Sequence, residues 1–295
     1  MKFIENTLVR VAGTLLAFVG GMALTLWFAN VDVRALFERL LETHYGVAML
    51  SIPFVMVSHV LRAVRWKTLL EPSHPGTKLW NLFSAVMVGY GANNIVPRSG
   101  EVLRPYTLHR REHLPLSSLV ASVIVERFID VLNLLLFLSL ALFWVGERLR
   151  AVVPQADIPS FMNSVALSCL LLLAALLLLA GTTMVERIVR LILNPISSAA
   201  WLATEKVIVS FKDGLSILKY PRTYPLLAVQ SLSIWLFYIL PVYVMCMAFP
   251  ADPLHACSFL DACVILLVMA IATTLTPPVP GGFVLIPTPV SYTHL

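Results

Sequence analysis

Three charged residues, Glu126, Arg127 and Asp130, interrupt an apolar run that extends from Leu119 to Val145. Glu126 and Asp130 are four residues apart and share one face of a helix, while Arg127 and Asp130 are three apart and can form an ion pair. One charge at the centre of a bilayer costs about 2.5–3.5 kcal/mol, so three unpaired charges would cost roughly 8–10 kcal/mol. We therefore expect the cluster to face protein or water. It is either part of a substrate path or an interhelical ion-pair network without substrate contact.

A second polar stretch, NNIVPRSGEVLR, covers residues 93–104. Arg98 and Arg104 carry permanently charged, forked donors that suit phosphate. Glu101 lies three residues before Arg104 and can pair with it across one helical turn. The other candidate residues here are Asn93, Asn94, Pro97 and Gly100. The stretch is either a lipid-headgroup site at the cytoplasmic interface or a positive loop that only fixes topology.

The third candidate is TPPVPGG, residues 276–282, which follows the last apolar run. Three prolines and two glycines end any regular helix there. Apolar segments interrupted by Gly or Pro in two halves of a chain indicate a transporter binding site. Pro280, Gly281 and Gly282 therefore join the candidate substrate-binding residues, the alternative being a helix stop with a frayed tail.

The elements that carry these residues follow from composition. Of 295 residues, 59% are hydrophobic and only 13% are charged, against about 25% in an average soluble domain. This balance excludes a soluble enzyme, a disordered protein and a nucleic-acid binder, and it predicts an all-α, polytopic membrane helix bundle. Uncharged runs place about six spans at residues 9–29, 45–63, 118–145, 160–183, 225–249 and 259–276. We expect one integral membrane domain over residues 1–282 and a cytoplasmic loop over 186–222.

The run 79–97 is the exception, and the distribution of basic residues decides how it is interpreted. If every run crosses the membrane, the basic residues collect on the wrong side for a cytoplasmic N-terminus. If residues 79–97 form a re-entrant or broken segment, 16 of the 21 Lys and Arg side chains lie on the cytoplasmic side. We favour this topology, with the N-terminus cytoplasmic in a cell membrane, over an ordinary tilted span with a glycine-rich end.

Two further segments have weaker patterns. HVLRAVRWK, residues 59–67, predicts an interfacial anchor at the end of the second span, because Trp, Arg and Lys favour the membrane surface. A helical stripe beside three lysines predicts a helix lying on the anionic leaflet. Its members are Val207, Phe211, Leu215 and Leu218. The four cysteines form no CxxC pair, and we expect no metal and no cofactor.

In order, the pieces LRAVRW, NNIVPRSGEVLRP, ERFID, SLSIWLFY and PPVPGG resemble the lysylphosphatidylglycerol synthase transmembrane family, a flippase-like membrane domain. The resemblance covers about residues 59–282 and implies a lipid-translocating role for the candidate residues named above. It implies a membrane lipid as partner (anionic, aminoacylated or polyprenyl-linked) and a separate lipid-modifying enzyme as a further partner. No synthase domain follows, so a stand-alone member is expected. Residues 283–295 depart from the family pattern and are expected to be an unstructured tail, truncated or foreign.

The resulting hypothesis is a non-enzymatic transporter that moves a phospholipid or lipid-linked headgroup between leaflets. Two alternatives remain open at this stage. One is a membrane enzyme that acts on lipid-linked phosphate, and the other is a scaffold subunit for a lipid-modifying synthase.

Overall fold

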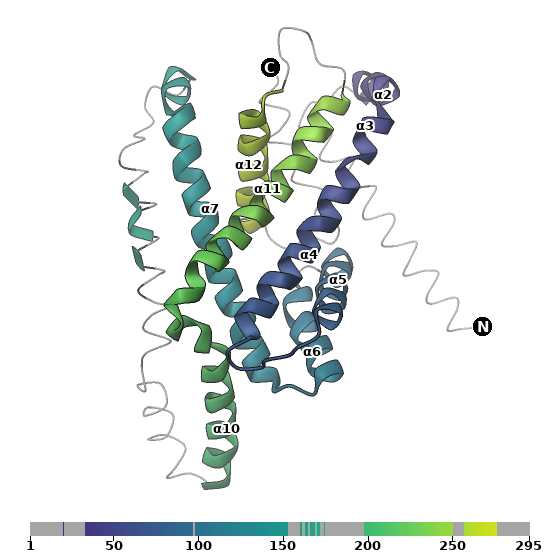
Figure 1. The fold of residues 1–295 in the computed structure, drawn as a ribbon. Helices are drawn as coiled ribbons and strands as arrows, with labels where there is room; N and C mark the ends of the chain where they lie inside the picture. Colours follow the sequence, from purple (N-terminus) through teal and green to yellow (C-terminus); the bar gives the residue numbers. More distant parts are fainter. Residues whose placement is uncertain are drawn as a thin grey trace, which may run out of the picture. The chain divides into compact units, whose positions relative to one another are not determined.

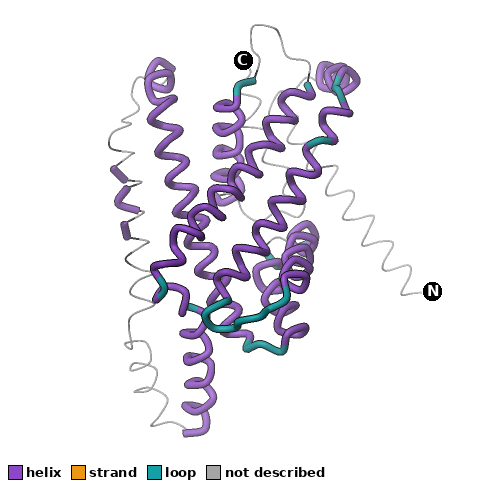
Figure 2. Tube along the Cα trace, in the orientation of Figure 1, coloured by secondary structure: helices purple, strands orange, loops and turns teal. Residues whose placement is uncertain are grey.

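A computed structural model of the chain describes residues 33–96, 98–152, 198–249 and 257–275, together with Gly20 and short pieces between residues 160 and 174. Within these ranges every regular element is a helix, so the described part of the chain is all-α (Figure 1; Figure 2). The helices are α2 (Val33–Glu42), α3 (Tyr45–Met49), α4 (Ser51–Leu70), α5 (Leu79–Ile95), α6 (Gly100–Glu112), α7 (Leu116–Val152), α10 (Ser198–Gly214), α11 (Tyr224–Ala248) and α12 (Phe259–Leu275), with the 3-10 helices η1 (Ser216–Lys219) and η2 (Pro221–Thr223) before α11.

The chain divides into two compact units. One consists of residues 1–55, 90–100 and 238–295, and the other of residues 56–89 and 101–237. In the first unit, the His44 N–H before α3 donates to the carbonyl of Ala248 at the end of α11, over 2.8 Å. The rings of Tyr243 on α11 and Phe259 on α12 pack edge to face, with centroids 5.8 Å apart.

The second unit gathers the ends of several helices. His74 Nε2, in the turn after α4, lies 2.8 Å from Ser118 Oγ at the start of α7. Gln230 Nε2 on α11 donates to Thr68 Oγ1 on α4 over 3.0 Å. Burial lowers the pKa of His74 below its ordinary value of 6.5, and the charge of Asp213 partly opposes this shift. The imidazole is therefore neutral at pH 7.

Helices α5 and α6 form a hairpin whose outer ends are joined by Glu112. Glu112 Oε1 accepts a hydrogen bond from Asn81 Nδ2 over 2.6 Å and from the backbone N–H of Lys78 over 3.3 Å. At about 1.5 Å per residue, the 17 residues of α5 extend about 26 Å and the 13 residues of α6 about 20 Å. Neither length reaches the roughly 30 Å of a bilayer core.

Helix α10 packs along α7 at a contact that requires a glycine. A Cβ on Gly214 would lie 2.2 Å from the carbonyl oxygen of Ser118 and 2.7 Å from the Cβ of Ala121. This close approach seats Leu215 and Ile217 in a buried apolar cluster. The cluster consists of Leu69, Ala121, Val125, Leu215, Ile217 and Leu227.

The leaflet-facing interpretation of the stripe on α10 and η1 is wrong for three of its members. Leu215 is buried in the cluster just described, and Phe211 and Leu218 pack against it, whereas Val207 is 56% exposed. The apolar face of this segment is covered by protein because Gly214 lets the chain approach α7 closely. Spacing alone does not distinguish a protein-covered face from a lipid-covered one.

Two helical stretches in the described residues are long and apolar enough to cross a membrane, Tyr45–Leu70 and Pro221–Ala248. Four large apolar side chains on α11 are at least 43% exposed. These residues are Leu226, Val229, Leu232 and Leu236. The shorter helix Phe259–Ala270 is also apolar. An apolar surface of this kind on helices of this length fits lipid contact.

The helices can be set beside the expected spans. Helices α11 and α12 lie within one residue of the predicted 225–249 and 259–276, and α7 extends beyond 118–145 at both ends. Predicted spans 9–29 and 160–183 fall largely outside the described residues, as do the break at 276–282 and the tail 283–295. The predicted loop 186–222 contains α10 and the 3-10 helices. The single domain over 1–282 and the number of membrane crossings stay predictions.

Replacing Gly214 with alanine is expected to destabilise the protein by about 1–3 kcal/mol, because the new methyl group overlaps backbone atoms of α7 that cannot move away freely. The free energy of unfolding in detergent, from a denaturant titration, is the measurement. Gly91→Ala on α5 is the matched control, since a Cβ there meets nothing within 4 Å. Alanine favours the helix at such a position. Equal stabilities of the two variants would contradict the close contact.

Candidate functional site

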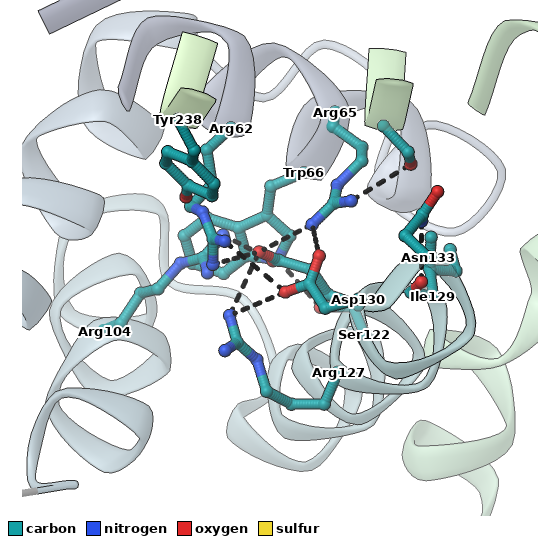
Figure 3. A network of polar contacts seen from close by, with 12 residues as sticks. Arg62, Arg65, Trp66, Arg104, Ser122, Arg127, Ile129, Asp130, Asn133 and Tyr238 are labelled. Carbon is teal, nitrogen blue, oxygen red and sulfur yellow. Dashed lines mark hydrogen bonds and ion pairs between the residues drawn. The ribbon is translucent and has the colours of Figure 1, made fainter. Parts of the chain in front are cut away.

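A network of six charged side chains from three helices forms the candidate site. Four guanidinium groups surround two carboxylates within the second unit (Figure 3). The arginines are Arg62 and Arg65 on α4, Arg104 on α6 and Arg127 on α7, and the acids are Glu126 and Asp130 on α7. We call this set the charge network.

Glu126 lies at the centre of the charge network. Its side chain is fully buried, and its Oε1 contacts Arg62 Nη1 at 3.1 Å, Arg65 Nη2 at 3.3 Å and Arg127 Nη2 at 3.4 Å. Its Oε2 lies 2.7 Å from Arg104 Nη2. One carboxylate thus contacts all four guanidinium groups, each of which is a permanent cation.

Asp130, one helical turn further along α7, completes the ion pairing. Its Oδ1 pairs with Arg65 Nη2, and its Oδ2 lies 3.4 Å from Arg62 Nη2 and 3.3 Å from Arg127 Nη2. The pair between Arg127 and Asp130 that the spacing of three predicts is therefore formed. Because Glu126 and Asp130 share one face of α7, both carboxylates meet the same arginines of α4.

Neutral side chains hold two of the arginines in place. The guanidinium carbon of Arg104 lies 3.9 Å from the ring centroid of Trp66, which is a cation–π contact. Trp66 Nε1 donates to Ser122 Oγ over 2.9 Å, which fixes the indole against α7. Arg65 Nη1 donates to Ser231 Oγ on α11 over 3.0 Å. The position of Arg65 thus depends on α11 as well as on α7.

The charge network is mostly buried and contains more cations than anions. The side chains of Arg62, Arg65 and Arg104 are at most 8% exposed, while Arg127 is 39% and Asp130 is 17% exposed. Four cations against two anions leave an excess of two positive charges. Burial of an ion costs several kcal/mol of desolvation, so an excess of buried cations among the described residues attracts an anion. Arg127 is the most exposed member of the network.

Some of the buried donors have no hydrogen-bond partner among the described residues. They are the Nε atoms of Arg65, Arg104 and Arg127. Arg104 Nη2, by contrast, lies 2.7 Å from Glu126 Oε2, which is a charge-assisted contact. The network therefore has donor capacity beyond what its own acceptors use.

The other predicted residues of the 93–104 stretch lie around the turn between α5 and α6. Asn93 Oδ1 accepts a hydrogen bond from the backbone N–H of Gly100 over 2.7 Å, so this amide stabilises the first turn of α6. Asn94 is exposed, and Arg98 is exposed with a left-handed φ of 64°. Glu101 is exposed whereas Arg104 is buried, and the acid that pairs with Arg104 is Glu126.

Some candidates fall outside the described residues. These are Pro97, Pro280, Gly281 and Gly282. A substrate-binding role for any of the residues predicted from the sequence stays a prediction. Within the described ranges, no group of three or more His, Cys, Asp and Glu side chains is placed to hold a metal ion.

The interpretation of residues 59–67 as an interfacial anchor is wrong. Helix α4 continues to Leu70, and within it Arg65 and Trp66 are completely buried. The reason is electrostatic, because the acids of α7 need cationic partners that α4 supplies. The sequence did contain a signal for this contact. Arg62, Arg65 and Trp66 are spaced so that they share one face of a helix. The two acids of α7 have only Arg127 as a cation nearby on their own helix, so they need further cations from another helix.

Comparison with known proteins identifies the family. The sequence profile described as the lysylphosphatidylglycerol synthase TM region matches residues 10–286. The chain belongs to this family. The lysylphosphatidylglycerol synthase TM region is a membrane domain, and the helices described above are those of a transmembrane protein of this family. The resemblance expected from the sequence motifs is confirmed.

Three relatives match this chain over part of their length. The chain is 26% identical over 136 residues to a UPF0104 membrane protein of Methanocaldococcus jannaschii, covering 45% of this chain and 40% of the relative. It is 28% identical over 125 residues to the glycosyltransferase AglD of Haloferax volcanii, covering 42% and 20%. It is 24% identical over 123 residues to a UPF0104 membrane protein of Pyrococcus horikoshii, covering 40% and 36%. The matches span less than half the length of these relatives, and no solved structure matches.

The charge network predicts that loss of the central acid, Glu126, destabilises the protein more than loss of the most exposed arginine, Arg127. Glu126→Gln is expected to lower the free energy of unfolding by about 3–5 kcal/mol, because it leaves buried guanidinium groups without their shared partner. Arg127→Gln is expected to cost no more than about 1 kcal/mol, because this side chain is 39% exposed and one of an excess of cations. Denaturant titration in detergent measures both.

Glu71→Gln is the control for the loss of one acid, since Glu71 is exposed in the turn that follows α4. If Glu126→Gln and Glu71→Gln were equally stable, Glu126 would not be the centre of the network.

Proposed function

We propose that this protein moves the headgroup of an anionic lipid between the leaflets of the membrane, using the charge network as the headgroup site. The observation that carries the proposal is the excess of two positive charges, mostly buried, in a helical membrane protein. Ionisable side chains within membrane helices are costly, and they usually mark substrate or ion pathways.

The sign of the excess selects among the lipids that the family resemblance allows. An anionic headgroup lowers the electrostatic energy of four closely spaced guanidinium groups, whereas an aminoacylated headgroup brings a further cation to them. Arginine forks also match the geometry of phosphate oxygens. Anionic phospholipids and lipid-linked phosphates are therefore favoured over lysyl-bearing ones.

Translocation requires the network to replace the hydration of the headgroup while the acyl chains stay in lipid. An anion that enters beside Arg127 would exchange partners with Glu126 and Asp130, whose ion pairs with Arg127 are 3.4 and 3.3 Å long. Such an exchange keeps each guanidinium group paired throughout. The protein thereby lowers the barrier that hydrocarbon sets against a charged group.

We propose in addition that the α5–α6 hairpin enters and leaves the membrane on the cytoplasmic side, with the N-terminus on the same side. The contacts of Glu112 with Asn81 and with the Lys78 backbone support this, because they hold the start of α5 and the end of α6 together. Both helices are shorter than a bilayer core. A re-entrant hairpin also brings Arg104 to the acids of α7.

Cysteine labelling tests this topology. In a background without native cysteines, Lys78→Cys and Arg111→Cys are expected to react with a membrane-impermeant maleimide from the same, cytoplasmic, side of the membrane. Both positions are exposed and flank the hairpin. Labelling of the two positions from opposite sides would show that the 79–97 segment crosses the membrane and would exclude re-entry.

Reconstitution tests the transport itself. Liposomes that contain the purified protein are expected to lose inner-leaflet fluorescence of labelled phosphatidylglycerol to external dithionite faster than empty liposomes. Arg104→Gln and Asp130→Asn are expected to slow this loss by about tenfold or more, the order of one lost charge-assisted hydrogen bond. The control Glu71→Gln should retain the wild-type rate.

Three other outcomes would contradict the proposal. A wild-type rate equal to that of empty liposomes would reject transport by the isolated chain. Recovery of a chemically altered lipid would replace the transporter by an enzyme. Equal rates for wild type and both network variants, with all proteins monodisperse, would reject the charge network as the path.

A further inference from the structure

We infer that the charge network takes a phosphate monoester dianion in preference to a phosphodiester or a zwitterionic headgroup. The inference deepens the proposed function and rests on it for the lipid origin of the ligand. It is carried by the juxtaposition of four guanidinium groups with two carboxylates at a position where one arginine, Arg127, is partly exposed.

The net charge of the network favours a dianionic ligand. The network has an excess of two positive charges, and its three most buried arginines are held at fixed positions by Glu126, Trp66 and Ser231. A phosphodiester headgroup carries one negative charge and leaves one cation uncompensated. A phosphate monoester carries nearly two negative charges above its second pKa of about 6, so it neutralises the excess.

The hydrogen-bond donors of the network also favour a phosphate monoester. Each arginine has five N–H donors, and the two carboxylates offer about four acceptor positions each. Donors remain without a hydrogen-bond partner among the described residues at the Nε atoms of Arg65, Arg104 and Arg127. A phosphate monoester presents three terminal oxygens, whereas a diester presents two. The monoester therefore matches the larger number of available donors.

The positions of Arg104 and Arg127 around Glu126 allow one phosphate to contact both arginines. Arg104 is held between the face of Trp66 and the Oε2 of Glu126, with only 7% of its side chain exposed. Arg127 approaches the same Glu126 at Oε1 and is 39% exposed. A phosphate beside Glu126 would contact both arginines, of which Arg127 is the more exposed.

Two lipids with identical acyl chains separate the two phosphate classes. We expect purified wild-type protein in detergent at pH 7.5 to bind dioleoyl phosphatidic acid at least about tenfold tighter than dioleoyl phosphatidylglycerol, the order of one extra charge-assisted hydrogen bond. Microscale thermophoresis measures both dissociation constants. Equal affinities, or tighter binding of the phosphodiester or of dioleoyl phosphatidylcholine, would overturn the inference.

The pH dependence gives an independent readout. Lowering the pH from 7.5 to 5 converts the monoester to a monoanion, so its advantage over the diester is expected to fall to about threefold or less. The charged and titratable groups near the site are His59, Arg62, Arg65, Arg104, Glu126, Arg127 and Asp130. Both lipids meet these same groups, so the ratio of the two affinities removes any titration of the protein. A ratio that does not change with pH would overturn the inference.

Two variants with opposite expected signs guard against misfolding as an explanation. Arg127→Gln lowers the positive excess from two to one, and it should reduce the preference for the monoester about tenfold. Asp130→Asn raises the excess from two to three, and it should tighten the binding of both lipids. Arg110→Gln, exposed on α6, should change neither affinity. A loss of binding in both network variants would contradict the charge argument.

Competition with glycerol 3-phosphate distinguishes a lipid-borne phosphate from a free one. Competition at least a hundredfold weaker than by phosphatidic acid assigns the site to a lipid and supports both proposals. Competition of equal strength assigns it to a soluble monoester, which supports the present inference and contradicts the lipid transport. Conversely, transport of phosphatidylglycerol with no monoester preference would support the proposed function and overturn this inference.

Discussion

Glu126 is fully buried and is contacted by four guanidinium groups, and the packing of α4, α6 and α7 in the second unit depends on this contact. A buried carboxylate requires cations close by, and buried cations require fixed positions. Helix α4 must therefore turn the face that carries Arg62 and Arg65 toward α7, and α6 must bring Arg104 to the same point. The stacking of Arg104 on Trp66 follows from that approach.

The sequence predicted the part of the site that lies within one helix. Three charges in an apolar run cost too much to face lipid, and a spacing of three forms the pair between Arg127 and Asp130. The partners on α4 were misinterpreted, because Arg and Trp at a helix end have the same composition whether they lie at a membrane interface or inside a bundle. Only the tertiary contact with α7 distinguishes the two. The headgroup role of Asn93 stays a prediction, and the structure adds that its side chain accepts a hydrogen bond at the start of α6.

Charge alone indicates the limits of some helices. Helices α11 and α12 begin and end within one residue of the segments predicted from uncharged runs, while their role as membrane spans stays a prediction. Helix α4 ends seven residues later than predicted, at Leu70, because its arginines were treated as the end of the span. The apolar stripe on α10 and η1 was correctly predicted to be helical, but the sequence did not show that protein covers it. The close contact with α7 depends on the absence of a side chain at Gly214, and a pattern of hydrophobic residues does not reveal such a contact.

The order of the charges along the chain has a consequence for how the protein is made. Arg62, Arg65 and Arg104 are all synthesised before Glu126 and Asp130, so during translation α4 carries cations whose partners do not yet exist. The ion pairs that join α4 and α6 to α7 therefore form only after α7 has been synthesised, so the charge network is one of the later contacts of this part of the chain to form.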